Sequence, residues 1–162
     1  MNVRDQAARG LWAWARAWAF AVTLTGAVVG LDQATKQIAI SSISAGEPNE
    51  LVFGIDLANV RNKGVAFGIQ AGGKAGVLVL TLGALALLLA YFGASRRKAV
   101  LWPAVGLITG GALGNLADRI RIGAVIDFLD PPLWPAFNLA DVSIVLGVAL
   151  LVFVLRAPPV RA

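Results

Sequence analysis

Two long runs of uncharged residues lie in the middle of the chain. Residues 75–95 and 99–117 contain no Asp, Glu, Lys or Arg, which gives neutral runs of 21 and 19 residues. At about 1.5 Å per residue, a helix of this length crosses the roughly 30 Å hydrocarbon core of a bilayer. The second run is rich in glycine and alanine, which would let neighbouring helices approach closely. Both runs predict membrane spans.

Two shorter apolar runs predict two further spans. Residues 17–31 are apolar, and tryptophans before them and residues 33–40 after them extend the run. Residues 142–155 are uncharged but too few to cross alone, so this helix must begin near Phe137 and carry Asp141 into the membrane edge. The four predicted spans are 14–40, 75–95, 99–117 and 137–155.

The two longer connecting segments, 41–73 and 119–136, carry a different pattern. Apolar residues alternate with other residues at Leu51, Phe53, Ile55 and Leu57, which is typical of a β-strand. We expect a second strand, or a pair of strands, within 60–69, and so a small antiparallel sheet. Glycine and prolines in 119–136 favour a strand or loop followed by a turn or short helix. The pattern predicts one membrane domain over residues 1–162, mainly α-helical with four transmembrane helices.

Composition removes several kinds of chemistry. The chain has 162 residues, of which 58% are hydrophobic and 14% charged, and it contains no His and no Cys. Zinc hydrolysis, Ser-His and Cys-His catalysis and thiol redox chemistry are therefore excluded. We expect no metal and no cofactor, so any catalysis must use carboxylates, amines, amides and hydroxyls.

The charges are distributed unequally over the two sides of the predicted membrane domain. One side, with both termini and the turn at 94–98, carries +7, and the other side carries −2, for a net charge of +5. The positive-inside rule therefore places both termini in the cytoplasm. Topology explains the basic excess, so we expect no nucleic-acid partner. A cleaved N-terminal signal peptide is a competing interpretation, but Asp32 and Lys36 interrupt the region of its cleavage site, which favours an uncleaved span.

Ionisable residues at the outer ends of the spans mark a candidate site, because such groups are costly near hydrocarbon unless they are paired or hydrated. Asp32 and Lys36 are spaced i,i+4, so they could form a structural ion pair or belong to a site. Asn115, Asp118 and Arg119 share one helix end, where they could form a polar contact between helices or contact a substrate.

Two further acids, Asp127 and Asp141, complete the candidate site. Asp127 lies within an apolar run, and Asp141 follows Asn138 by three residues near the start of the last span. Capping of the helix N-terminus is an alternative for Asn138 and Asp141, and an exposed loop position is an alternative for Asp127. Two carboxyl groups close together in a low dielectric cannot both ionise easily, so one keeps its proton while the other can act as a base toward water. Aspartyl peptide hydrolysis needs this arrangement.

Five sequence blocks, in this order, resemble the signature motifs of the bacterial lipoprotein signal peptidase family, also called signal peptidase II. They are Leu31–Lys36 (LDQATK), Asn62–Phe67 (NKGVAF), Gly110–Arg119 (GGALGNLADR), Val125–Phe128 (VIDF) and Phe137–Asp141 (FNLAD). The blocks extend over residues 31–141, and the length of the chain and its four predicted spans also fit the family. Val65 departs from the family pattern, in which alanine is commoner, and adds bulk beside Gly64.

The resemblance implies an aspartic endopeptidase of the bacterial inner membrane. Such enzymes remove signal peptides from prolipoproteins by cutting before a cysteine that carries diacylglyceryl. The implied fold has four transmembrane helices, a small extracytoplasmic sheet that forms a cradle for substrate, and a short outer helix over the site. The implied catalytic dyad is Asp127 and Asp141. The implied substrate-binding or site-shaping residues are Asn62, Gly64, Asn115, Arg119 and Asn138, with support from Asp32, Lys36 and Asp118. The implied partners are the lipidated substrates and membrane lipids, and the implied oligomeric state is a monomer.

Two rival functions remain open from the residues alone. A small membrane carrier or proton relay could use the same interfacial carboxylates, but it would distribute acids along a path to both faces of the membrane. Here the acids are predicted to gather at one face. A non-enzymatic assembly subunit could use the polar residues only to lock its helices together.

Overall fold

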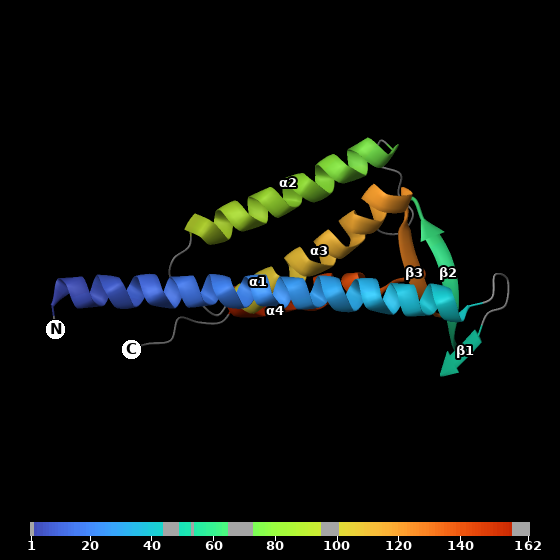
Figure 1. Cartoon of the computed structure of the whole chain (residues 1–162), viewed down its shortest axis with the longest axis horizontal. Helices are drawn as coiled ribbons and strands as arrows, with labels where there is room; N and C mark the ends of the chain where they lie inside the picture. The colour runs from blue at the N-terminus through green and yellow to red at the C-terminus, as the bar shows by residue number, and fades with distance from the viewer. Residues whose placement is uncertain (1, 44–48, 53, 65–72, 95–100, 157–162) are drawn as a thin grey trace.

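Seven helices and strands make up the described part of the chain. The structure is a computed structural model that describes residues 2–43, 49–52, 54–64, 73–94 and 101–156. In chain order the elements are α1 (Val3–Ser42), β1 (Asn49–Val52), β2 (Ile55–Asn62), α2 (Gly73–Ala94), α3 (Trp102–Ile122), β3 (Val125–Asp130) and α4 (Leu139–Arg156). The helices lie lengthwise, and the strands cross one end of them (Figure 1). The start of α1 and the end of α4 lie at the opposite end.

Each predicted span coincides with a helix, but the bounds differ most at α1 and α3. The first helix already begins at Val3, and α3 runs five residues beyond the predicted end of its span, to Ile122. The charged residues at the end of α3 do not terminate the helix, because they find partners on α1 and near β2. The helix stops at Gly123, whose φ of 74° is left-handed and whose N–H donates to the Arg119 carbonyl at 3.1 Å.

Membrane-crossing ability differs among the helices. By length and composition, two of the described helices are apolar enough to cross a membrane: Asp5–Ser42 within α1, and α4. A shorter apolar stretch, Leu78–Gly93, lies within α2.

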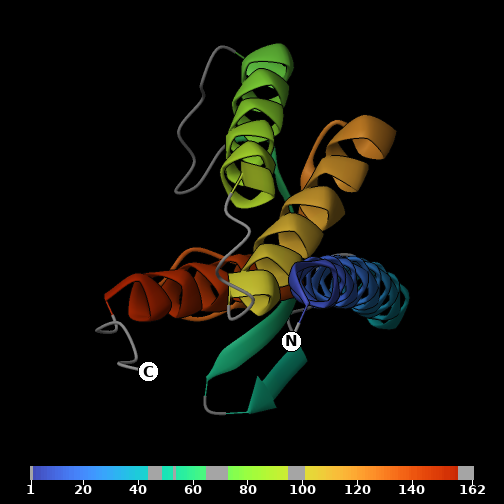
Figure 2. The ribbon, with the colours of Figure 1, turned by 90° about the vertical axis from the view of Figure 1, so that its left-hand side faces the viewer.

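Glycines bring α3 into close contact with helices on two sides. A Cβ at Gly110 would lie 2.7 Å from the Cβ of Val28 on α1. A Cβ at Gly111 would overlap the Ala140 carbonyl and lie 2.8 Å from Ile144 on α4. The prediction that small residues let helices approach is confirmed. In Figure 2, α3 starts between α1 and α4, while α2 stands to one side.

The apolar core lies at the end of the bundle farthest from the sheet. Phe92 of α2 packs against Val105 of α3, and both are buried. The ring of Trp102 lies 4.7 Å from that of Trp18 on α1, centroid to centroid. Apolar packing thus joins α1, α2 and α3 at this end, and the polar residues described below lie at the other end, next to the sheet.

The described strands form a three-stranded antiparallel sheet in the order β1-β2-β3. The predicted antiparallel sheet is confirmed, but its strands differ from the predicted ones. The alternating run 51–57 is two strands rather than one, because the chain turns at Gly54, where φ is 75°. The strand expected within 60–69 ends at Asn62, and residues 65–69 lie outside the described part.

A short outer helix is absent from the described residues between α3 and α4. Residues 131–138 form a turn in which the Trp134 N–H donates to the Pro131 carbonyl at 3.3 Å. Three prolines in this segment remove backbone donors and disfavour a helix. The part of the expectation that placed a strand and then a turn in 119–136 is confirmed, with the strand at β3.

Candidate active site

Asp127 points from β3 into a polar cluster. It is only 2% exposed, although it lies on a strand at the end of the molecule. Its Oδ2 accepts a hydrogen bond from Asn62 Nδ2 at 3.0 Å, and its Oδ1 accepts one from Asn138 Nδ2 at 2.7 Å. The interpretation of Asp127 as an exposed loop acid is therefore wrong.

Asp141 occupies the first turn of α4, where it takes part in a capping box. Its backbone N–H donates to Asn138 Oδ1 at 3.0 Å, and its own Oδ2 accepts from the Asn138 N–H at 3.2 Å. The capping interpretation of both residues is confirmed. Capping is not the only interaction of Asp141, because its Oδ1 also accepts a hydrogen bond from Asn115 Nδ2 at 2.8 Å.

Both carboxyl groups line a cavity of about 390 Å³ between the helices and the sheet. Its polar wall includes Asn62, Asn115 and Arg119 as well as the two aspartates. The remaining lining is mostly apolar and comes from Thr81, Ala112, Val125, Trp134, Pro135, Ala136, Phe137, Ile144 and Val145. The two acids thus face a shared space that is polar on one side and apolar on the other.

Burial raises the pKa of Asp127 to about 6. Hydrogen bonds from Asn62 and Asn138 oppose this shift, and the negative charge of Asp141 adds to it. A carboxyl group with this pKa can hold or release a proton near neutral pH, which is the property that acid–base catalysis needs.

Arg119 connects the cavity to the end of β2. Its Nη2 donates to the Gly64 carbonyl at 3.0 Å, and the Gly64 N–H donates to Asn62 Oδ1 at 2.9 Å. These contacts hold the Asn62 amide so that its nitrogen faces Asp127. The guanidinium lines the cavity beside the two carboxyl groups.

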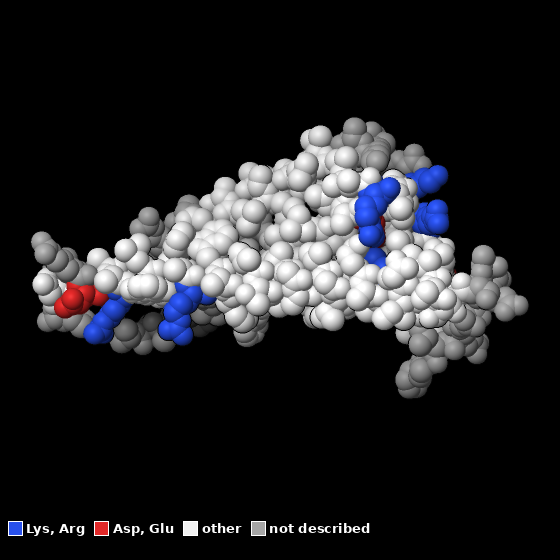
Figure 3. Space-filling view, viewed as in Figure 1, with Lys and Arg blue, Asp and Glu red and all other residues white. Residues whose placement is uncertain are grey.

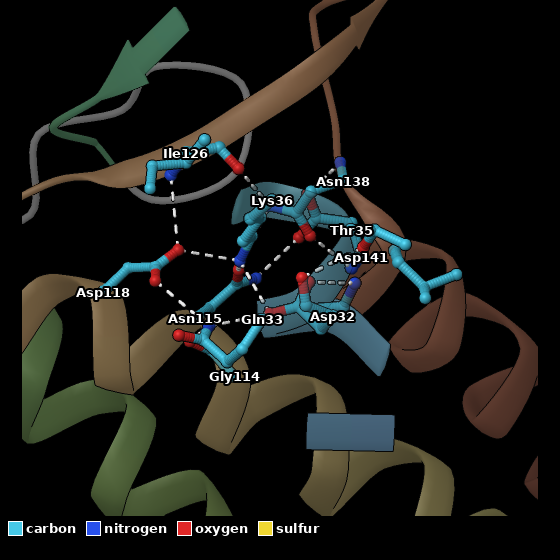
Figure 4. Close-up of polar contacts among 12 residues, drawn as sticks. Asp32, Gln33, Thr35, Lys36, Gly114, Asn115, Asp118, Ile126, Asn138 and Asp141 are labelled. Atoms are coloured by element: carbon cyan, nitrogen blue, oxygen red, sulfur yellow. Dashed lines mark hydrogen bonds and ion pairs between the residues drawn. The ribbon is translucent and has the colours of Figure 1, made fainter. Parts of the chain in front are cut away.

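A buried ion network lies directly behind the cavity. Lys36 Nζ lies 2.9 Å from Asp32 Oδ2 and 2.8 Å from Asp118 Oδ2, and none of the three side chains is more than 1% exposed. Figure 4 shows these residues converging from α1 and α3. Asp32 also accepts the Ala140 N–H at 2.9 Å, which ties α1 to the first turn of α4.

The same lysine sets the orientation of the Asn115 amide. Lys36 Nζ can only donate, and it donates to Asn115 Oδ1 at 3.0 Å. Asn138 Nδ2 donates to the same oxygen at 3.1 Å. The nitrogen of the Asn115 amide must therefore face Asp141. The ion pair of Asp32 and Lys36 is thus both structural and one contact away from the candidate dyad.

Two members of this network were not singled out from the sequence. Gln33 Nε2 donates to Asp118 Oδ1 at 3.1 Å, and its Oε1 accepts from Arg121 Nη2 at 2.7 Å. Arg121 also lies 3.1 Å from Asp118 Oδ1. The i,i+3 spacing of Asp118 and Arg121 was a usable signal, whereas nothing local indicated that Gln33 would meet residues more than 80 positions away.

Comparison with known proteins identifies the family. The family model described as "Signal peptidase (SPase) II" matches residues 24–156. The chain belongs to the signal peptidase II family.

Relatives within the family match most of the chain. It is 42% identical over 129 residues to the lipoprotein signal peptidase of Halothermothrix orenii, covering 79% of this chain and 89% of the relative. It is 42% identical over 138 residues to that of Pelotomaculum thermopropionicum, covering 84% and 91%. It is 43% identical over 141 residues to that of Nitratidesulfovibrio vulgaris, covering 81% and 85%.

Two solved structures share the fold of this chain. Two structures described as bacterial membrane enzymes, determined by the in meso method at 2.3 and 1.9 Å resolution, superpose with TM-scores of 0.76 and 0.75 at 30% identity. Each match covers 85% of this chain, with 87% and 93% of the solved chains. The fold described above is therefore that of a bacterial membrane enzyme.

The structure brings the sequence-predicted residues into one region. Five of them line the cavity, namely Asn62, Asn115, Arg119, Asp127 and Asp141. Gly64 and Asn138 bind members of that set, and Asp32, Lys36 and Asp118 form the ion network behind it. Among the described residues, no three Asp, Glu, His or Cys side chains come together to hold a metal ion. The arrangement provides two carboxyl groups, amide donors and a guanidinium, which are suited to hydrolysis by a carboxylate pair.

Proposed function

We propose that this chain is an aspartic endopeptidase that removes signal peptides from diacylglyceryl-modified prolipoproteins, cutting before the lipidated cysteine. Membership of the signal peptidase II family supports the activity. The single observation that carries the assignment to residues is the shared cavity that Asp127 and Asp141 line. We assign these two residues as the catalytic dyad.

The dyad works as a coupled pair. One carboxylate deprotonates a water that attacks the scissile carbonyl, and the protonated partner donates toward the developing oxyanion or the leaving amine. The raised pKa of Asp127 and the four hydrogen bonds to the two side chains support this division of labour.

The rest of the cavity positions the substrate. Asn62, Asn115 and Arg119 supply amide and guanidinium donors that can hold an extended peptide against the carboxylates. The apolar wall, with Ala112, Ile144 and Val145, receives the acyl chains. Each buried methylene contributes about 0.8 kcal/mol, so lipidation of the substrate would strongly favour binding.

The membrane placement follows the charge pattern. On the face shown in Figure 3, charged side chains gather at the two ends, and the long stretch between them carries none. We propose that α1 to α4 all span the inner membrane, with both termini in the cytoplasm and the sheet forming an extracytoplasmic cradle. On this placement the described acids other than Asp5 lie at the outer face, which disfavours a proton path across the membrane. The enzyme acts as a monomer in this proposal.

Cleavage by the purified chain in detergent tests the proposal. The substrate is a diacylglyceryl-modified prolipoprotein, and its control is the same protein with the lipidated cysteine replaced by serine. We expect the first to be cut before its cysteine and the second to stay intact. Equal cleavage of both, or no cleavage by a folded protein, would contradict the proposed substrate class.

A further inference from the structure

The loop between β3 and α4 exposes an unusually apolar surface. Pro132, Leu133, Trp134 and Pro135 are all exposed, and Leu133 is 96% and Trp134 60% accessible. No Asp, Glu, Lys or Arg occurs between Asp130 and Asp141. Contiguous apolar surface of this kind marks a contact with a membrane or a partner.

The exposed side chains of this loop lie on a turn whose backbone is held by hydrogen bonds. The base of the loop is closed by a bridge in which the Phe137 N–H donates to the Leu129 carbonyl at 2.9 Å and the Leu129 N–H donates to the Phe137 carbonyl at 3.0 Å. The Trp134 N–H donates to the Pro131 carbonyl at 3.3 Å. These hydrogen bonds hold the backbone on both sides of Leu133.

The length of α4 sets the level of this loop relative to the bilayer. The helix has 18 residues, Leu139–Arg156. At about 1.5 Å per residue it is about 27 Å long, slightly shorter than a hydrocarbon core of about 30 Å. All of α4 is therefore needed to cross, and its first residue lies at the outer edge of the hydrocarbon. The segment 131–135 ends four residues before this point, so it lies at the headgroup level, where tryptophan is favoured.

The loop also continues the lipid-facing surface of α4. Val145 and Leu146, on the outer half of that helix, are 66% and 56% exposed. Val145 and Trp134 line the same cavity. One side of the cavity is therefore formed by the loop and by the exposed face of α4, which contacts acyl chains in the proposed membrane placement.

We propose that residues 131–135 form an interfacial anchor, which inserts into the outer leaflet beside the mouth of the cavity. The partner is the bilayer itself, through its headgroup and upper acyl region. The anchor holds the mouth of the cavity at the depth where the lipidated end of a substrate lies. This inference rests on the membrane placement proposed above.

Spin labels at single cysteines measure the depth directly, because the chain has no natural cysteine. Leu133→Cys tests the loop. Asn59→Cys, exposed on β2, is the aqueous control, and Val148→Cys, 45% exposed in the middle of α4, is the lipid control. Each labelled protein is reconstituted in vesicles of phosphatidylcholine and phosphatidylglycerol. Collision rates with oxygen and with a water-soluble nickel chelate then report lipid and water.

We expect the label at Leu133 to give an oxygen-to-nickel ratio severalfold above that at Asn59 and approaching that at Val148. If the ratio at Leu133 equals that at Asn59 while Val148 reports lipid, the anchor is wrong and the proposed membrane placement stands. If Val148 also reports water, the membrane placement fails and the anchor fails with it. Cleavage of lipidated substrate by the same labelled proteins assesses the proposed activity separately.

Discussion

Lys36 is the buried charge on which the polar end of the molecule depends most. It forms ion pairs with both Asp32 and Asp118, and all three side chains are shielded from water. Removal of one partner from such a network leaves uncompensated buried charge, which costs about 3–5 kcal/mol. We therefore expect Lys36→Met to lower the free energy of unfolding by this amount, as measured by thermal unfolding in detergent.

Lys63→Met is the matched control for that change. Lys63 is exposed and directly follows β2. Its replacement removes a charge of the same sign but takes no ion-pair partner away from a buried acid. Its melting temperature should stay close to that of the parent. If Lys36→Met were as stable as Lys63→Met, the network would not hold the helices together as described.

The Asp127 carboxyl makes stability depend on pH. Its pKa is about 6 in the folded protein, against about 3.9 in an unfolded chain. Between these values the unfolded state binds fewer protons, so the stability contributed by this group falls as pH rises from about 4 to about 6. Asp127→Asn removes the effect. The stability of the variant relative to the parent should rise by roughly 2–3 kcal/mol between pH 4 and pH 7.

Thermal melts of both proteins across this pH range check the sign. A constant difference between Asp127→Asn and the parent would mean that the carboxyl has an ordinary pKa.

At the scale of elements, the contact between α3 and α4 sets the spacing of the site. Gly111 lies against the Ala140 carbonyl, one residue before Asp141. A methyl group there would overlap that carbonyl and push the helices apart. We expect Gly111→Ala to destabilise the protein by about 1–3 kcal/mol and to reduce cleavage, because the 2.8 Å contact between Asn115 and Asp141 would lengthen.

The comparison for this change is Gly83→Ala in α2. A Cβ at Gly83 would meet no atom within 4 Å, and alanine is the better helix former by about 1 kcal/mol. Stability should therefore be unchanged or slightly higher, with full cleavage activity. Equal behaviour of the two alanine variants would show that the α3–α4 contact tolerates separation.

The helices were predictable from sequence to a greater degree than the strands. Charge-free runs determine where a chain can cross hydrocarbon, and each predicted span coincides with a helix. The extension of α3 to Ile122 was not predictable, because it depends on partners for Asp118 and Arg121 that come from α1. The hairpin was missed since an alternating pattern continues through Gly54 without a break.

At the scale of the whole molecule, the charge asymmetry predicts the topology. We expect a cysteine at Gln6→Cys to be protected from a membrane-impermeant maleimide in intact spheroplasts and to react after lysis. Asn59→Cys should react in both cases, because the proposed topology places the sheet outside. Labelling of Gln6→Cys in intact spheroplasts would mean that the orientation is inverted.

The candidate site was largely predictable as a set of residues and not as a geometry. Polar residues in an apolar chain stand out, and the motif blocks that contain them are spread over residues 31–141. Their convergence depends on long-range contacts such as that between Asn62 and Asp127, 65 positions apart. The double role of Asn138, as helix cap and as hydrogen-bond donor to Asp127, also needed the structure.

The most direct test of the central claim is the cleavage rate of lipidated substrate by variants of the two cavity aspartates. Asp127→Asn and Asp141→Asn are compared with Asp130→Asn, which removes an acid from the same strand outside the cavity lining. Loss of acid–base catalysis predicts that kcat/KM falls by about 10²–10⁴-fold in each of the first two, while Asp130→Asn stays close to the parent. A folded Asp127→Asn or Asp141→Asn that cleaves at nearly the parental rate would contradict the proposed dyad.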